Sequence, residues 1–219
     1  MSNKPWLSQY PSEIPAEIDV APYQSVVELL DNAFASHASR PALTSMGRTS
    51  TFAELDLMSR RFAAWLQSQG AVKGDRIALM MPNLMPFAVC VLGALRAGCT
   101  VVTINPLYTP RELAHQVKDS GAETLVVFEA FAGTVAQALE GMELKRIVVV
   151  GTGGQAAALP GQIDFAQTLQ MGAAATFTPV NVGPEDLAFL QYTGGTTGLS
   201  KGACLSHRNL VANTEQYKA

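Results

Sequence analysis

One segment, residues 192–202, has the composition of a phosphate-binding loop. It reads Tyr-Thr-Gly-Gly-Thr-Thr-Gly-Leu-Ser-Lys-Gly and follows the apolar run 187–190. Its glycines let the backbone bring N–H groups close to an anion, its threonines add hydroxyl donors, and its lysine suits phosphate oxygens. A flexible surface loop is the plain alternative, but the apolar run, the dense hydroxyls and the lysine favour phosphate binding. The residues expected to contact phosphate are Thr193, Gly194, Gly195, Thr196, Thr197, Gly198 and Lys201.

The order of residues speaks against a P-loop NTPase, because that motif ends in Gly-Lys-Ser/Thr. Here Ser200 precedes Lys201 and Gly202 follows it. The segment instead resembles the signature loop of the adenylate-forming superfamily, Tyr-Thr-Ser/Gly-Gly-Thr-Thr-Gly-x-Pro-Lys-Gly. Acyl-CoA synthetases, luciferases and the adenylation domains of peptide synthetases belong to that superfamily. Gly194 stands where many members have serine and Ser200 where many have proline, and the double glycine is similar to the long-chain fatty acyl-CoA synthetase branch.

Three further stretches resemble the same superfamily. Residues 51–55 (Thr-Phe-Ala-Glu-Leu) are similar to its early Thr-Tyr/Phe-x-Glu-Leu helix start, and residues 95–98 (Leu-Arg-Ala-Gly) to its Leu-x-Ala-Gly segment. Residues 105–113 with 119–122 resemble the corresponding stretch of long-chain acyl-CoA synthetases. Each alone is a structural signal without assigned chemistry. Together, in this order, they extend the resemblance over residues 6–213.

The resemblance implies a two-step reaction that uses ATP, Mg²⁺ and coenzyme A. A long-chain fatty carboxylate attacks the α-phosphate of ATP to give acyl-adenylate and pyrophosphate, and coenzyme A then takes the acyl group as a thioester. Because an anionic carboxylate must approach a triphosphate, charge must be spread onto Mg²⁺, N–H groups, hydroxyls and lysine. The resemblance makes Lys201 and Thr196 catalytic and adds Tyr192 to the residues that bind the nucleotide phosphates. It assigns no metal ligand within the chain.

His207 and Ser206 follow the loop closely enough to reach the site. A lone histidine near a helix start is more often a packing or capping residue than a catalytic one, and we favour that interpretation. Ser206 is expected to be the N-cap of the following helix.

Composition narrows the class of protein. Of 219 residues, 48% are hydrophobic and 15% charged, which is typical of a globular chain. The net charge of −3 gives no basic footprint for nucleic acid. Three cysteines without metal-binding spacing fit a reducing compartment, so a cytoplasmic location is expected. Residues 77–95 carry no charge, but Pro82, Asn83 and Pro86 within them favour a strand, a turn and a buried helix over a membrane span.

Apolar runs alternate with helical patterns between residues 76 and 150. Short continuous apolar runs at 76–81, 99–104, 124–128 and 146–150 suit strands covered on both faces. Strict alternation predicts right-handed crossovers and an α/β fold with a doubly wound, mostly parallel sheet and flanking helices. The helices are expected at 25–37, 52–69, 87–97, 110–119, 130–139 and 164–171, and a pair of short strands at 42–45 and 48–52.

Residues 151–154 (Gly-Thr-Gly-Gly) follow a predicted strand and partly match the glycine-rich fingerprint of dinucleotide-binding proteins. The third glycine of that fingerprint is missing, and Pro160 and Gly161 interrupt the helix that should follow. We therefore expect residues 151–162 to form a connection.

We expect three parts in the chain. Residues 1–23 form an extended arm, which either lies on a surface or is disordered. Residues 24–183 form an α/β subdomain, and residues 184–219 begin the next part of a large N-terminal domain, with the phosphate-binding loop.

Chains of the superfamily run to more than twice this length, and their adenine-contacting motif, acidic metal ligand and C-terminal domain lie after the Thr/Gly loop. We therefore expect an N-terminal fragment of a long-chain acyl-CoA synthetase that is inactive alone. The alternative is a complete, non-catalytic module that binds a nucleotide or a partner. The sequence leaves open the acyl chain length and a homodimer through the arm. It also leaves open peripheral association with the inner membrane surface, which no basic amphipathic segment supports.

Overall fold

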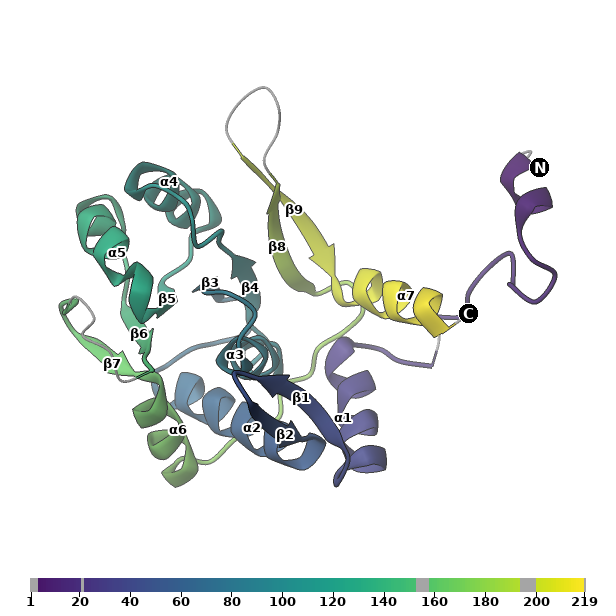
Figure 1. Cartoon of the computed structure of the whole chain (residues 1–219), viewed down its shortest axis with the longest axis horizontal. Coiled ribbons are helices and arrows are strands. Elements are labelled where there is room, and N and C mark those ends of the chain that lie inside the picture. The colour runs from purple at the N-terminus through teal and green to yellow at the C-terminus, as the bar shows by residue number, and fades with distance from the viewer. Residues whose placement is uncertain (1–3, 21, 153–157, 194–199, 219) are drawn as a thin grey trace.

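A seven-stranded sheet forms the centre of the molecule in the computed structural model, which describes residues 4–20, 22–152, 158–193 and 200–218 (Figure 1). The strand order is β7-β6-β5-β3-β4-β8-β9. Neighbouring strands are parallel except for β8 and β9, which are antiparallel. The mostly parallel, doubly wound sheet is therefore confirmed. The strands are β3 (Arg76–Met80), β4 (Thr100–Thr103), β5 (Thr124–Phe128), β6 (Arg146–Val150), β7 (Gln162–Asp164), β8 (Leu187–Thr193) and β9 (Lys201–Ser206).

Helices cover both faces of this sheet, and a separate two-stranded hairpin lies beside it (Figure 1). The hairpin consists of β1 (Pro41–Ser45) and β2 (Arg48–Thr51). Short 3₁₀ turns occur at Pro5–Gln9, Glu129–Phe131 and Leu139–Gly141. The α-helices are α1 (Val26–His37), α2 (Phe52–Ser68), α3 (Met85–Arg96), α4 (Pro110–Ser120), α5 (Ala132–Ala138), α6 (Phe165–Ala174) and α7 (His207–Lys218).

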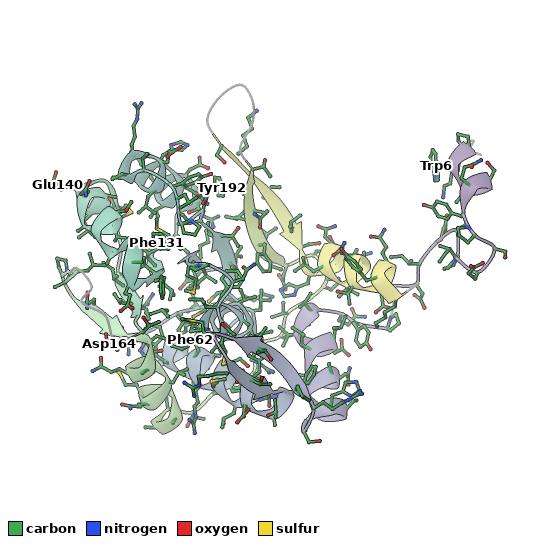
Figure 2. All side chains as sticks on the ribbon, in the orientation of Figure 1. Trp6, Phe62, Phe131, Glu140, Asp164 and Tyr192 are labelled. Atoms are coloured by element: carbon green, nitrogen blue, oxygen red, sulfur yellow. The ribbon has the colours of Figure 1, made fainter. Side chains whose placement is uncertain are left out.

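The alternation of side chains along each strand divides the interior into two cores. Ile77 and Leu79 of β3 pack with residues of α2 and α3, whereas Ala78 and Met80 pack with residues of α4 and α5. Figure 2 labels an aromatic side chain from each core, Phe62 on the α2 side and Phe131 beside α5. Because most residues of β3, β4, β5 and β6 are buried, these runs are almost continuously apolar in the sequence.

Local capping explains where the helices begin. At the start of α2, the Thr51 N–H donates to Glu54 Oε2 (2.8 Å), and the Glu54 N–H donates back to Thr51 Oγ1 (3.2 Å). This is the predicted capping box. A second box joins Thr109 and Glu112 at the start of α4, and Gly121 ends that helix with a φ of +65°.

Two strands depart from the sequence-based expectation. The stretch predicted as a connection ends earlier than expected, because Gln162 begins β7 and pairs with Ile147 of β6. Residues 153–157 of that stretch lie outside the described part. The other strand, β9, was not predicted, because Lys-Gly-Ala-Cys-Leu-Ser lacks the apolar pattern of a strand. Its strand form depends on pairing with β8 rather than on propensity.

The beginning of the arm projects from the body of the molecule (Figure 1). It contains the 3₁₀ turn Pro5–Gln9 instead of being extended throughout. Trp6 and Tyr10 are 54% and 45% exposed, so these aromatic side chains are largely open to solvent. The proposed boundary between residues 183 and 184 stays a prediction.

Candidate phosphate-binding site

The β8–β9 hairpin holds both ends of the Thr/Gly segment. Thr193 at the end of β8 pairs with Lys201 at the start of β9, and Tyr192 pairs with Gly202. The sequence between the two strands therefore starts and finishes at one place on the hairpin stem. Of the predicted site residues, Gly194, Gly195, Thr196, Thr197 and Gly198 lie outside the described residues, whereas Tyr192, Thr193 and Lys201 lie within them.

The hairpin stem is closed by a hydrogen bond from Ser200. Its Oγ donates to the Thr193 carbonyl oxygen at 2.8 Å, directly beside the Thr193–Lys201 pair. Many members of the superfamily have proline at this position, whereas Ser200 here forms a hydrogen bond across the stem. Thr193 and Lys201 are both exposed, and within the described residues Lys201 forms no ion pair. A free ammonium group at the end of a fixed stem is suited to an anionic ligand.

Tyr192 is fixed by contacts on two sides. Its hydroxyl donates to Oδ2 of Asp119, a residue in the last turn of α4, at 2.6 Å. Burial and the Asp119 carboxylate raise the pKa of Tyr192 well above its usual value, so the phenol stays neutral. Its ring also lies over Gly202, where an added Cβ would come within 2.9 Å of Tyr192 Cε2.

A cleft of about 350 Å³ lies at the carboxyl edge of the sheet, beside this stem. Ligands of open α/β sheets bind outside the carboxyl ends of the strands. Gln191 and Tyr192 bring β8 to the cleft, and Thr103 Oγ1 donates to Gln191 Oε1 at 2.9 Å. Polar side chains that line the cleft are Asn83, Asn105, Tyr108, Thr103 and Gln191. These residues carry no recognisable signal in the sequence, because only the pairing of the strands brings them together.

His207 has a structural role. Its side chain is 1% exposed, and its Nδ1 accepts a hydrogen bond from the Val26 N–H at 3.3 Å. Burial lowers the pKa of His207 to about 4, so the ring is neutral near pH 7. The packing interpretation is therefore the correct one. Ser206 caps the helix as expected, since the Asn209 N–H donates to its Oγ at 3.3 Å.

The described residues offer no ready metal centre and no membrane span. Within residues 4–20, 22–152, 158–193 and 200–218, no three His, Cys, Asp or Glu side chains are grouped to hold a metal ion. In the same part of the chain, no helix combines the length and the hydropathy needed to cross a bilayer.

Comparison with known proteins gives consistent matches. A family model described as AMP-binding enzyme matches residues 30–219. The chain is 45% identical over 238 residues to the long-chain-fatty-acid–CoA ligase of Salmonella typhimurium, with 99% of this chain and 42% of that protein covered. It is 31% identical over 240 residues to the ligase of the same name from Bacillus subtilis, again with 42% of that protein covered. The chain thus spans less than half the length of these curated relatives.

Solved structures agree with the sequence matches. The fold resembles a long-chain-fatty-acid–CoA ligase from Archaeoglobus fulgidus with a TM-score of 0.76 at 29% identity, covering 92% of this chain and 40% of that one. It also resembles an anthranilate–CoA ligase bound to anthranoyl-AMP, with a TM-score of 0.77 at 25% identity, covering 85% of this chain and 35% of that one.

Proposed function

The chain belongs to the AMP-binding enzyme family, and from this premise we propose that the complete protein is a long-chain-fatty-acid–CoA ligase whose phosphate-binding part lies in these residues. The protein joins a fatty carboxylate to coenzyme A at the expense of ATP, through an acyl-adenylate. Curated relatives with this name match the chain from end to end.

One structural observation carries the proposal. The β8–β9 hairpin pairs Thr193 with Lys201 and so holds both ends of the Thr/Gly segment, beside a cleft at the carboxyl edge of the sheet. We propose that the ammonium of Lys201, the Thr193 and Thr196 hydroxyls and the N–H groups of Gly194, Gly195 and Gly198 bind the phosphates. Donors of this kind are what adenylation needs, since negative charge accumulates on the α-phosphate and the leaving pyrophosphate.

We also propose that Mg²⁺ binds together with ATP. Magnesium usually keeps several waters and is held by one or two carboxylates together with substrate phosphates. When bound, it supplies charge neutralisation that adds to that of Lys201.

Two proposals concern the surroundings of the enzyme. We infer that it acts in the cytoplasm with loose association to the inner membrane surface, where long-chain fatty acids partition. A second copy is proposed to dock on the arm, since Trp6 and Tyr10 expose their rings and aromatic side chains are enriched at interfaces. Sedimentation of the complete protein before and after removal of residues 1–23 tests the dimer, and flotation with vesicles of anionic phospholipid tests the membrane association.

The alternative is a module that binds a nucleotide or a partner without catalysis. Both functions predict ATP binding, so binding alone does not separate them. The deciding assay is ATP–pyrophosphate exchange by the complete protein with and without a long-chain fatty acid. Exchange that requires the fatty acid supports the ligase, and tight ATP binding without exchange supports the module.

Replacement of Lys201 tests the site itself. We expect Lys201→Ala to lower the exchange rate by about 10²–10³-fold, the usual effect of losing one preorganised contact to developing charge. Lys145→Ala is the matched control, because Lys145 is also exposed but pairs with Glu123 ahead of β6. Retained exchange in the Lys201 variant would remove that residue from the site.

A further inference from the structure

The hydrogen bond between Tyr192 and Asp119 links the phosphate-binding hairpin to a distant part of the chain. The two residues are 73 positions apart, and their oxygens lie 2.6 Å from each other. Tyr192 is the last residue but one of β8, whereas Asp119 lies in the last turn of α4. Asp119 is not part of the Thr/Gly segment, and nothing in its sequence surroundings indicates chemistry.

The surroundings of Tyr192 leave its ring little freedom. The ring packs with the core on the α4 and α5 side of the sheet. Across the hairpin it covers Gly202, whose missing side chain leaves the space that the ring fills. The hydroxyl points towards α4, where it donates to Asp119. A contact at this position restrains both strands of the stem, since Tyr192 belongs to one and touches the other.

Helix α4 is itself firmly attached to the sheet. Its inner residues Leu113 and Val117 are buried, and Gln116 Nε2 donates to the Thr103 carbonyl oxygen at 2.8 Å. Thr103 in turn donates to Gln191, the neighbour of Tyr192. Two hydrogen-bonded routes thus lead from α4 to adjacent residues of β8, one through the end of β4 and one directly from Asp119.

We propose that Asp119 is a positioning residue of the nucleotide site, acting through the Tyr192 hydroxyl to fix the hairpin stem from which Lys201 and Thr193 reach the phosphates. The inference rests on the proposed function. Under this proposal the Tyr192 hydroxyl does not bind phosphate directly. A hydroxyl that donates its proton to a carboxylate has none left for a phosphate oxygen. Asp119 itself touches neither substrate nor reacting atoms.

Steady-state kinetics of the complete protein test the proposal. We expect Tyr192→Phe to raise the KM for ATP about tenfold while the KM for the fatty acid stays unchanged. A displacement of 1 Å costs about 10²-fold in well-ordered sites, and here one of several restraints is lost. Asp119→Ala should have the same effect, and the double variant should be no worse than either single one, because residues that act as one unit are not additive.

A conservative variant and matched controls separate positioning from general damage. Asp119→Asn keeps an acceptor oxygen, so it should restore most of the affinity for ATP that Asp119→Ala loses. Tyr217→Phe removes a hydroxyl from an exposed tyrosine on α7, and Glu143→Ala removes an exposed carboxylate from a loop. Both controls should behave as wild type, and all variants should keep the wild-type melting temperature.

The outcomes are distinct. If Tyr192→Phe weakens ATP binding and Asp119→Ala does not, the hydroxyl contacts phosphate directly and the proposal is wrong. If both variants match wild type in an active enzyme, the link has no role in the site. If the wild-type protein shows no fatty-acid-dependent exchange, the proposed function fails instead.

Discussion

The buried imidazole of His207 connects two distant parts of the chain. The Nδ1 atom accepts from the Val26 N–H, 181 positions earlier in the chain, so the ring connects the start of α7 to the start of α1. A sequence pattern identifies a histidine beside a binding loop and cannot tell which way its ring points. Here the ring points inward, and its role is stability.

The burial of His207 predicts a dependence of stability on pH. Its folded pKa is about 4, while an unfolded histidine has a pKa of about 6.5. Between these values the unfolded chain binds the extra proton, so stability falls as the pH drops from about 6.5 to about 4. The full loss from this group is about 3 kcal/mol, at 1.36 kcal/mol per unit of pKa.

Urea unfolding of the chain at pH 7 and pH 5 measures this effect. His207→Asn keeps an acceptor for the Val26 N–H without the titrating ring, so the variant should lose much less stability between the two pH values than the wild type. Equal losses in the two proteins would mean that the ring is protonated or exposed in the fold.

At the scale of elements, the close approach of α6 to α2 depends on one glycine. A Cβ added at Gly172 would collide with the carbonyl oxygen of Arg61 in α2. A backbone atom cannot move aside as the end of a flexible side chain can. The two helices would therefore have to move apart to make room for the Cβ. We expect Gly172→Ala to destabilise the fold by about 3 kcal/mol, at the upper end of overpacking costs.

The matched control is Gly133→Ala on α5, where nothing lies within 4 Å of the added Cβ. Alanine is the better helix former, so this variant should gain up to about 1 kcal/mol. Chemical denaturation of both variants checks the pair. A Gly172 variant as stable as wild type would show that α6 packs less closely than described.

Element prediction from the sequence succeeded where local signals are strong. The capping box at Thr51 and the Pro-initiated helix at Pro110 both begin where the pattern indicates. The apolar runs 124–128 and 146–150 became strands with the same bounds. Strand β9 was not predicted because its residues have no strand pattern of their own. Strand β7 was not predicted because it has only three residues, at the edge of the sheet.

At the scale of the whole molecule, the alternation of strands and helices predicted the sheet class but not its strand order. The strand order depends on which strands pair with each other. This pairing depends in turn on which face of the sheet each helix covers. The candidate site divides in the same way. Residue types alone indicate the segment proposed to bind phosphate, whereas Asp119, Asn105 and Gln191 come near the hairpin only through the topology.

Under the proposed function the fatty carboxylate attacks the α-phosphate of ATP, and the fate of one carboxylate oxygen tests this step directly. The complete protein is incubated with ATP, coenzyme A and palmitate labelled with ¹⁸O in its carboxylate. If the carboxylate attacks the α-phosphate, one labelled oxygen remains on phosphorus when coenzyme A displaces AMP, and the label appears in AMP. Label in inorganic phosphate, with ADP as the other product, would mean attack on the terminal phosphate and would contradict the account.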